Sequence, residues 1–274
     1  MKRVRRGVLV LLSSLCIAIA ARDPVPSVQE YPTALARERQ TVVVGGIVVG
    51  GIKETWELRW KDPPKPACEP REDSLTCPCT GFAYGEGGDL WLVRMRGAKE
   101  IDRLDLTPLF AGAEINVGDI AVLPRWPTEE NDFAASEKEG FAEIVARRPT
   151  VKVMDFADYD HDGRRTEFYL KTDTLPCGKN VGVVVGMSKS NPRLHVFGSV
   201  YKPNEPLVLQ KHVWEALSRA RGTVEVEDWP CGDHGAEQGT SVRIRATNKG
   251  IDAVRRTHEC PVVPGQTPLA QEPI

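Results

Sequence analysis

The sequence lacks an excess of positive charge, an apolar run of spanning length and the short motifs of the common hydrolases. It has 36 Lys and Arg residues against 38 Asp and Glu residues, and no basic patch with interleaved aromatic residues stands out, so nucleic-acid binding is disfavoured. The apolar stretch near the N-terminus is interrupted by Ser13 and Ser14 and is shorter than the roughly 20 residues that a membrane-spanning helix needs. Neither H-E-x-x-H nor G-x-S-x-G occurs, and no Gly-Lys-Ser/Thr follows the paired glycines of 45–51. The motifs therefore identify neither a common hydrolase nor a phosphate-binding loop.

The N-terminus has the order of features typical of an export signal. A basic start is followed by apolar residues from Val8 to Leu12 and by Ala18-Ile19-Ala20, a small-x-small cleavage pattern. We predict a signal peptide over residues 1–21 and release of the mature chain as a secreted or periplasmic protein, with no transmembrane segment. Cleavage removes four of the 36 basic residues, which leaves 32 against 38 acidic residues and a net charge of −6.

The cysteine content agrees with export. Six cysteines follow the signal peptide, and they are Cys68, Cys77, Cys79, Cys177, Cys231 and Cys260. An even number in an oxidising compartment predicts three disulfides, although the sequence leaves the pairing open. Cys231 and Cys260 could staple the C-terminal region. The alternative is a zinc site built on Cys68, Cys77 and Cys79, which lacks the paired C-x₂-C spacing of typical zinc sites.

Patterning of apolar residues predicts a β-rich α+β fold with antiparallel sheets and one or two helices, stapled by disulfides. The chain divides into a flexible lead-in at 22–40, a β-rich half at 41–125, an α+β half at 126–260 and a disordered, proline-rich tail at 261–274. Strands are expected at 41–51, 56–60, 90–96, 151–157, from 168 onward, and at 181–186, 194–197, 223–227 and 241–246. Helices are expected at 128–147 and 211–221, the second with Val213, Leu217 and Ala220 on one face. No repeat of fixed period is present, which argues against a complete propeller.

An acidic loop, Asp158-Tyr-Asp160-His-Asp162-Gly163, is the most informative motif. Carboxylates at alternating positions can point toward one cation, the glycine permits a sharp turn, and the carbonyl of Arg164 can add an oxygen. The alternative is a solvated turn in which the aspartates accept hydrogen bonds from backbone N–H groups.

About twenty residues around this motif resemble the calcium loops of FG-GAP and VCBS-type repeats of secreted β-propeller proteins. The resemblance implies side-chain ligands at Asp158, Asp160 and Asp162 and a strand on either side of the loop. At the ninth position, where those repeats carry an acid, this chain has Thr166, and Glu167 follows one place later. The resemblance therefore implies a structural calcium ion, with Glu167 as a further ligand.

Two groups of residues could support an enzyme instead. His212 and Glu215 lie three residues apart in the second predicted helix, and Asp233 and His234 follow Cys231 in a glycine-rich turn. The alternative is that the first pair is an exposed polar pair on an amphipathic helix and the second lies in a glycine-rich surface turn, since neither pattern is specific to an enzyme. The six tryptophans could line a carbohydrate groove but at their wide spacing are more often core residues.

We therefore expect an exported binding or structural module with a structural calcium site. Its partner would be an extracellular protein or a glycan. The alternative is a secreted metal-assisted hydrolase that uses His212, Glu215, Asp233 and His234.

Overall fold

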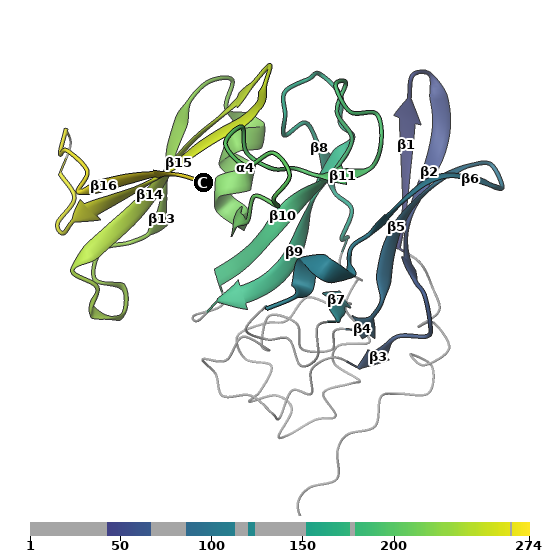
Figure 1. Cartoon of the computed structure of the whole chain (residues 1–274), viewed down its shortest axis with the longest axis horizontal. Helices are drawn as coiled ribbons and strands as arrows, with labels where there is room; N and C mark the ends of the chain where they lie inside the picture. Colours follow the sequence, from purple (N-terminus) through teal and green to yellow (C-terminus); the bar gives the residue numbers. More distant parts are fainter. Residues whose placement is uncertain (1–42, 67–85, 113–119, 124–151, 176–178, 264) are drawn as a thin grey trace, which may run out of the picture. The chain divides into compact units, whose positions relative to one another are not determined.

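The computed structural model describes residues 43–66, 86–112, 120–123, 152–175, 179–263 and 265–274. All of them belong to the unit Pro32–Ile274. Figure 1 shows their helices and strands. The predicted signal peptide, the lead-in at 22–40, the helix at 128–147 and the cysteines Cys68, Cys77, Cys79 and Cys177 lie outside these residues.

The described strands form antiparallel sheets (Figure 1). The first sheet has the order β1–β2–β5–β6, made by Val43–Val49, Ile52–Trp60, Leu90–Arg96 and Lys99–Asp105. The second sheet has the order β11–β10–β9–β8, with β12 also on β10, made by His195–Val196, Lys179–Gly186, Glu167–Leu175, Phe156–Ala157 and Leu209–Gln210. The third sheet has the order β13–β14–β15–β16, made by Val224–Trp229, Gln238–Thr247, Gly250–Glu259 and Ala270–Pro273. A small sheet joins β3, β4 and β7, which are Lys65–Pro66, Glu86–Gly88 and Ala121–Leu123.

The second sheet contributes to two hydrophobic cores. Val183 and Val185 of β10 belong to the first core, together with Trp56, Leu92 and other residues of the first sheet. Val184, between them, belongs to the second core. Because successive side chains of a strand point to opposite faces, the unbroken apolar run of β10 is explained by burial on both faces.

The predicted helix at 211–221 is confirmed as α4, Lys211–Arg219. Its Val213, Trp214 and Leu217 are buried in the second core. The helix contacts strands of both the second and the third sheets (Figure 1). It is the single α-helix in the described part of the chain, where two short 3₁₀ helices, Thr107–Phe110 and Asp233–Gly235, also occur.

Several strand predictions need correction. The segment 41–51 was expected to be a strand, but its described residues form β1 only over Val43–Val49, because Gly50 and Gly51 form the turn into β2. Val48 is 65% exposed while the neighbouring Ile47 is buried, because successive side chains of a strand point to opposite faces. In the segment predicted as a strand at 151–157, the described residues form a strand only at Phe156–Ala157.

The expectation of a disordered tail is wrong for its last residues. Ala270–Pro273 pairs with β15 as β16, and the Ile274 N–H donates to the Ala253 carbonyl over 3.1 Å. Prolines suggested disorder, but β16 lies at the edge of the third sheet, where a residue without an N–H is tolerated.

Of the expected disulfides, the structure describes Cys231–Cys260. Cys231 follows β13 and Cys260 follows β15, so the bond ties together two segments 29 residues apart at one end of the third sheet.

Candidate cation site in the acidic loop

The acidic loop connects β8 to β9 in the second sheet. The two strands pair through Phe156 with Phe168 and Ala157 with Glu167. This antiparallel pairing brings Glu167, at the end of the loop, back beside Asp158 at its beginning. Register therefore makes these two acids neighbours, although nine positions separate them in the sequence.

Hydrogen bonds within the loop fix its backbone. The N–H of Asp162 donates to Asp160 Oδ1 over 3.0 Å, and the N–H of Gly163 donates to Asp158 Oδ2 over 3.0 Å. His161 and Gly163 have positive φ angles of 57° and 87°, a conformation that glycine adopts freely and other residues seldom adopt. The predicted turn role of Gly163 is thus borne out by its backbone. These two hydrogen bonds use one carboxylate oxygen each of Asp160 and Asp158 and leave the second oxygen of each.

Three carboxylates converge at the base of the loop. One oxygen from each of Asp158, Asp160 and Glu167 lies within 4.8 Å of the other two. Glu167 has no exposed surface, and Asp158 Oδ1 is buried without a hydrogen-bond partner. A buried oxygen without a donor is costly, and a cation among three carboxylates would satisfy it.

The electrostatics of the cluster show the same need for positive charge. Burial raises the pKa of Glu167 to about 8. The Thr166 hydroxyl, 2.6 Å from Glu167 Oε1, and the Tyr159 N–H, 2.8 Å from Oε2, donate hydrogen bonds that oppose this shift. The carboxylates of Asp160 and Asp158 raise the pKa further. Burial also raises the pKa of Asp160 to about 6. Without a cation, Glu167 therefore holds its proton at neutral pH, whereas Asp160 is mostly ionised.

The remaining predicted ligands lie differently. Asp162 accepts hydrogen bonds from the N–H groups of Arg164, over 2.8 Å, and Lys189, over 2.6 Å. Asp162 therefore ties the loop to the segment after β10, and it is not one of the three converging carboxylates. Arg164 is exposed, and its backbone N–H donates the hydrogen bond to Asp162 given above. The solvated-turn alternative thus describes Asp162 well, whereas Asp158, Asp160 and Glu167 form the set that could hold a cation.

The loop also docks on helix α4 through residues that the sequence analysis did not single out. Nε2 of His161 donates to the Leu217 carbonyl in the last turn of the helix over 2.9 Å. Tyr159 packs edge-on against Trp214 with ring centroids 6.0 Å apart. Tyr159 and His161 alternate with the three aspartates in the sequence, and this alternation is the signal that could have placed their side chains on the side of the loop that faces the protein.

The residues proposed for a hydrolase engage separate partners. Nε2 of His212 lies 2.6 Å from the Glu227 carbonyl. Glu215 pairs with Lys211 and Arg219, at 3.7 and 3.3 Å, and Asp233 pairs with Lys179. The side chain of His234 is not among those that the structure describes. Within the described residues, His212, Glu215 and Asp233 do not belong to a group of converging metal-binding side chains.

No helix in the described part of the chain combines the length and apolarity that crossing a membrane requires. Comparisons with protein-family models, curated proteins and solved structures found no significant match.

Proposed function

We propose that this chain is an exported binding or structural module in which the acidic loop holds a structural calcium ion. The observation that carries the proposal is the convergence of Asp158, Asp160 and Glu167 within 4.8 Å, with one buried oxygen unpartnered. Oxygen donors alone suit a hard cation such as calcium. Backbone carbonyls and water would complete its coordination.

The resemblance to FG-GAP and VCBS-type loops supports the same ion. Their ninth-position acid is displaced by one residue in this chain, yet Glu167 lies at the cluster while Thr166 turns its hydroxyl toward the Glu167 carboxylate. The ion would join the start of the loop to β9. That position favours a role in stability over a role in chemistry.

Export is supported by two independent features. The N-terminal sequence has the basic, apolar and small-residue order of a signal peptide. The Cys231–Cys260 disulfide suits an oxidising compartment. An extracellular or periplasmic setting also supplies calcium at concentrations that a weak site needs.

Thermal unfolding in chelator and in calcium tests the proposal. A cation bound only by the folded state stabilises it by about 1.4 kcal/mol at ten times Kd, so 10 mM calcium should raise Tm if Kd is about 1 mM, the weak limit for extracellular modules. Asp160→Asn should reduce this response, because asparagine keeps the acceptor for the Asp162 N–H but lacks the charge.

The matched control is Asp155→Asn. Asp155 lies just before the loop, is 75% exposed and pairs with Lys152, so its replacement should leave the calcium response intact. A Tm that is the same in chelator and in 10 mM calcium would contradict the proposal. Equal losses of response in the two variants would assign the effect to surface charge instead of the cluster.

A further inference from the structure

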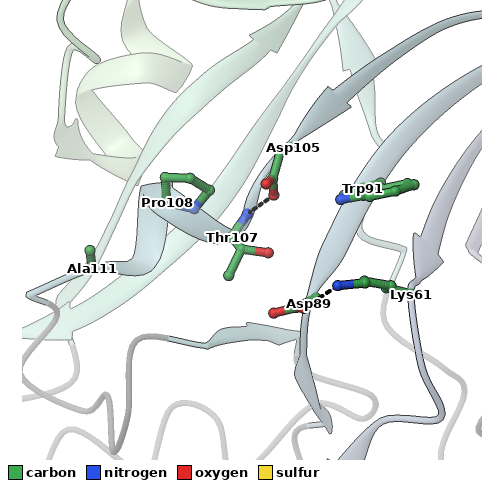
Figure 2. A pocket seen from close by; sticks show the side chains of 7 residues that line it. All are labelled: Lys61, Asp89, Trp91, Asp105, Thr107, Pro108 and Ala111. Atoms are coloured by element: carbon green, nitrogen blue, oxygen red, sulfur yellow. Dashed lines mark hydrogen bonds and ion pairs between the residues drawn. The ribbon is translucent and has the colours of Figure 1, made fainter.

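A pocket of about 310 Å³ lies beside the ends of β5 and β6 in the first sheet (Figure 2). Its lining residues are Lys61, Asp89, Trp91, Asp105, Thr107, Pro108 and Ala111. The pocket contains no residue of the acidic loop, so it constitutes a separate site.

The walls of the pocket are held by hydrogen bonds to buried strand residues. The N–H of Leu90 donates to Thr107 Oγ1 over 2.9 Å, and the N–H of Leu106 donates to the Leu90 carbonyl over 2.9 Å. Both leucines have no exposed surface. The N–H of Thr107 donates in turn to Asp105 Oδ1 over 3.0 Å. The polar groups of the pocket are therefore positioned before any ligand arrives, which lowers the cost of binding.

Trp91 provides an aromatic wall. Unlike Trp56 and Trp214, which have no exposed surface, Trp91 is only half-buried. The guanidinium of Arg103 lies over the ring, 4.3 Å from its centroid, and so covers one face of it. Figure 2 shows the indole nitrogen at the end of the ring that faces Asp105 and Thr107. This N–H is available to a ligand, because it makes no hydrogen bond to the described residues.

Donors and acceptors are mixed around the pocket. Lys61 pairs with Asp89 at 3.5 Å, and both side chains are about half exposed. The indole N–H of Trp91 and the Thr107 hydroxyl add donors, and Asp105 adds a second carboxylate. An anionic ligand would meet two carboxylates, and a cationic ligand would leave the donors of Lys61 and Trp91 unused. A neutral ligand whose groups both donate and accept satisfies all of them.

We infer that this pocket binds a neutral sugar ring, with its hydroxyls on Asp89, Asp105 and Lys61 and its apolar C–H surface against Pro108 and the part of the Trp91 ring that Arg103 does not cover. A pyranose fits within 310 Å³, and its hydroxyls supply the paired donor and acceptor character that the lining requires. A sugar would be the ligand of the proposed binding module, and its binding does not require a cation at the acidic loop.

The test uses the full mature chain and a panel of neutral monosaccharides, namely glucose, galactose, mannose and N-acetylglucosamine. A single ring in an open pocket should bind with Kd of about 1–10 mM. Titration followed by NMR should shift the Trp91 indole N–H resonance in a saturable manner with at least one of these sugars. Failure of all four to shift it would overturn the inference. Choline and inorganic phosphate are the ionic probes, and saturable binding of either one at this site with no sugar binding would also overturn it.

Trp91→Phe keeps an aromatic wall but removes the N–H donor, and it should weaken sugar binding about tenfold. Trp229→Phe is the matched control, because Trp229 is a half-buried tryptophan of β13 outside the pocket. Asp105→Asn is a second variant that keeps the acceptor for the Thr107 N–H, and it should weaken binding several-fold without unfolding the strand. Unaltered sugar affinity in both pocket variants would refute the site.

A chelator separates this inference from the proposed calcium site. Sugar binding should persist in chelator, because the pocket shares no residue with the acidic loop. If calcium failed to raise Tm while the chain still bound sugar, the result would therefore contradict the cation proposal alone.

Discussion

At the scale of single residues, Glu167 shows the cost of burying a carboxylate beside two others in the acidic loop. Its carboxyl is fully buried, and its pKa is raised from 4.5 to about 8. In the absence of a cation, the folded state therefore holds a proton that the unfolded state releases above about pH 4.5. Stability falls with rising pH wherever the folded state binds more protons. In chelator, the free energy of unfolding should therefore decline as the pH rises toward 8.

Calcium should remove this decline, because the cation takes the place of the proton. Urea denaturation between pH 6.5 and 8 measures the slope, and Glu167→Gln should flatten it in chelator because glutamine does not titrate. Asp160, with its pKa near 6, contributes with the same sign at the lower end of this range. Equal slopes for the wild type and Glu167→Gln would show that the glutamate does not control the pH dependence.

At the scale of elements, a buried ion network joins the strands of the first sheet to the segment after β10. Arg94 of β5 donates to both carboxylate oxygens of Glu54 on β2, each over 3.0 Å. A third nitrogen of Arg94 donates to the Pro192 carbonyl over 3.0 Å. The Glu54 side chain has no exposed surface and that of Arg94 is only 8% exposed. The contacts between Arg94 and Glu54 are therefore almost fully withdrawn from solvent.

Glu54→Gln should lower the free energy of unfolding by about 3 kcal/mol, since it removes the charge of the carboxylate that accepts two hydrogen bonds from the buried Arg94 and leaves Asp102, at 3.6 Å, as the more distant counter-charge. The matched control is Glu57→Gln on the same strand. Glu57 pairs with a partly exposed Arg59 at 2.6 Å, and such pairs contribute about 1 kcal/mol or less. Chemical denaturation of both variants measures the difference. Losses of similar size would mean that the buried pair contributes no more than the surface pair.

Some strands and helices could be predicted from the sequence, and others could not. β5 was predicted because it begins with a short unbroken apolar run, and α4 because its apolar residues follow the helical period. β6 and β15 were missed because charged residues break their alternation. In the structure these charges form pairs with residues of other strands, such as Glu100 of β6 with Arg59 of β2 and Asp252 of β15 with Arg245 of β14. Pairs of this kind depend on strand neighbours that no local pattern specifies.

The candidate cation site was predictable only in part for the same reason. The spacing of the loop identified Asp158 and Asp160 as a pair on one side of the backbone. Glu167 entered the predicted ligand set only through the resemblance, because its contact with the two aspartates depends on the β8–β9 register. The spacing also gave Asp162 the same role as the first two aspartates, whereas the Lys189 N–H draws its carboxylate toward another segment. Long-range contacts thus decide which acids converge.

At the scale of the whole described unit, the acidic loop lies where the two cores meet. Phe156, just before the loop, packs against the first core, and Tyr159, within it, belongs to the second core. Both cores also share strand β10, whose Val183 and Val184 face opposite sides. A cation bound at the loop would therefore stabilise both cores together, provided that they unfold as one cooperative unit.

Native-state hydrogen exchange tests this coupling with one amide in each core. Leu92 of β5 reports on the first core and Val242 of β14 on the second, and both are fully buried. Calcium at ten times Kd should slow the exchange of both amides by the same factor of about ten, because binding multiplies the population ratio of folded to unfolded chains. The amide of Val48 in the edge strand β1 serves as the control, because edge-strand amides exchange by local opening and should change less. Slowing at Val242 without slowing at Leu92 would show that the loop stabilises only the core that contains Tyr159 and α4, and that the two cores unfold separately.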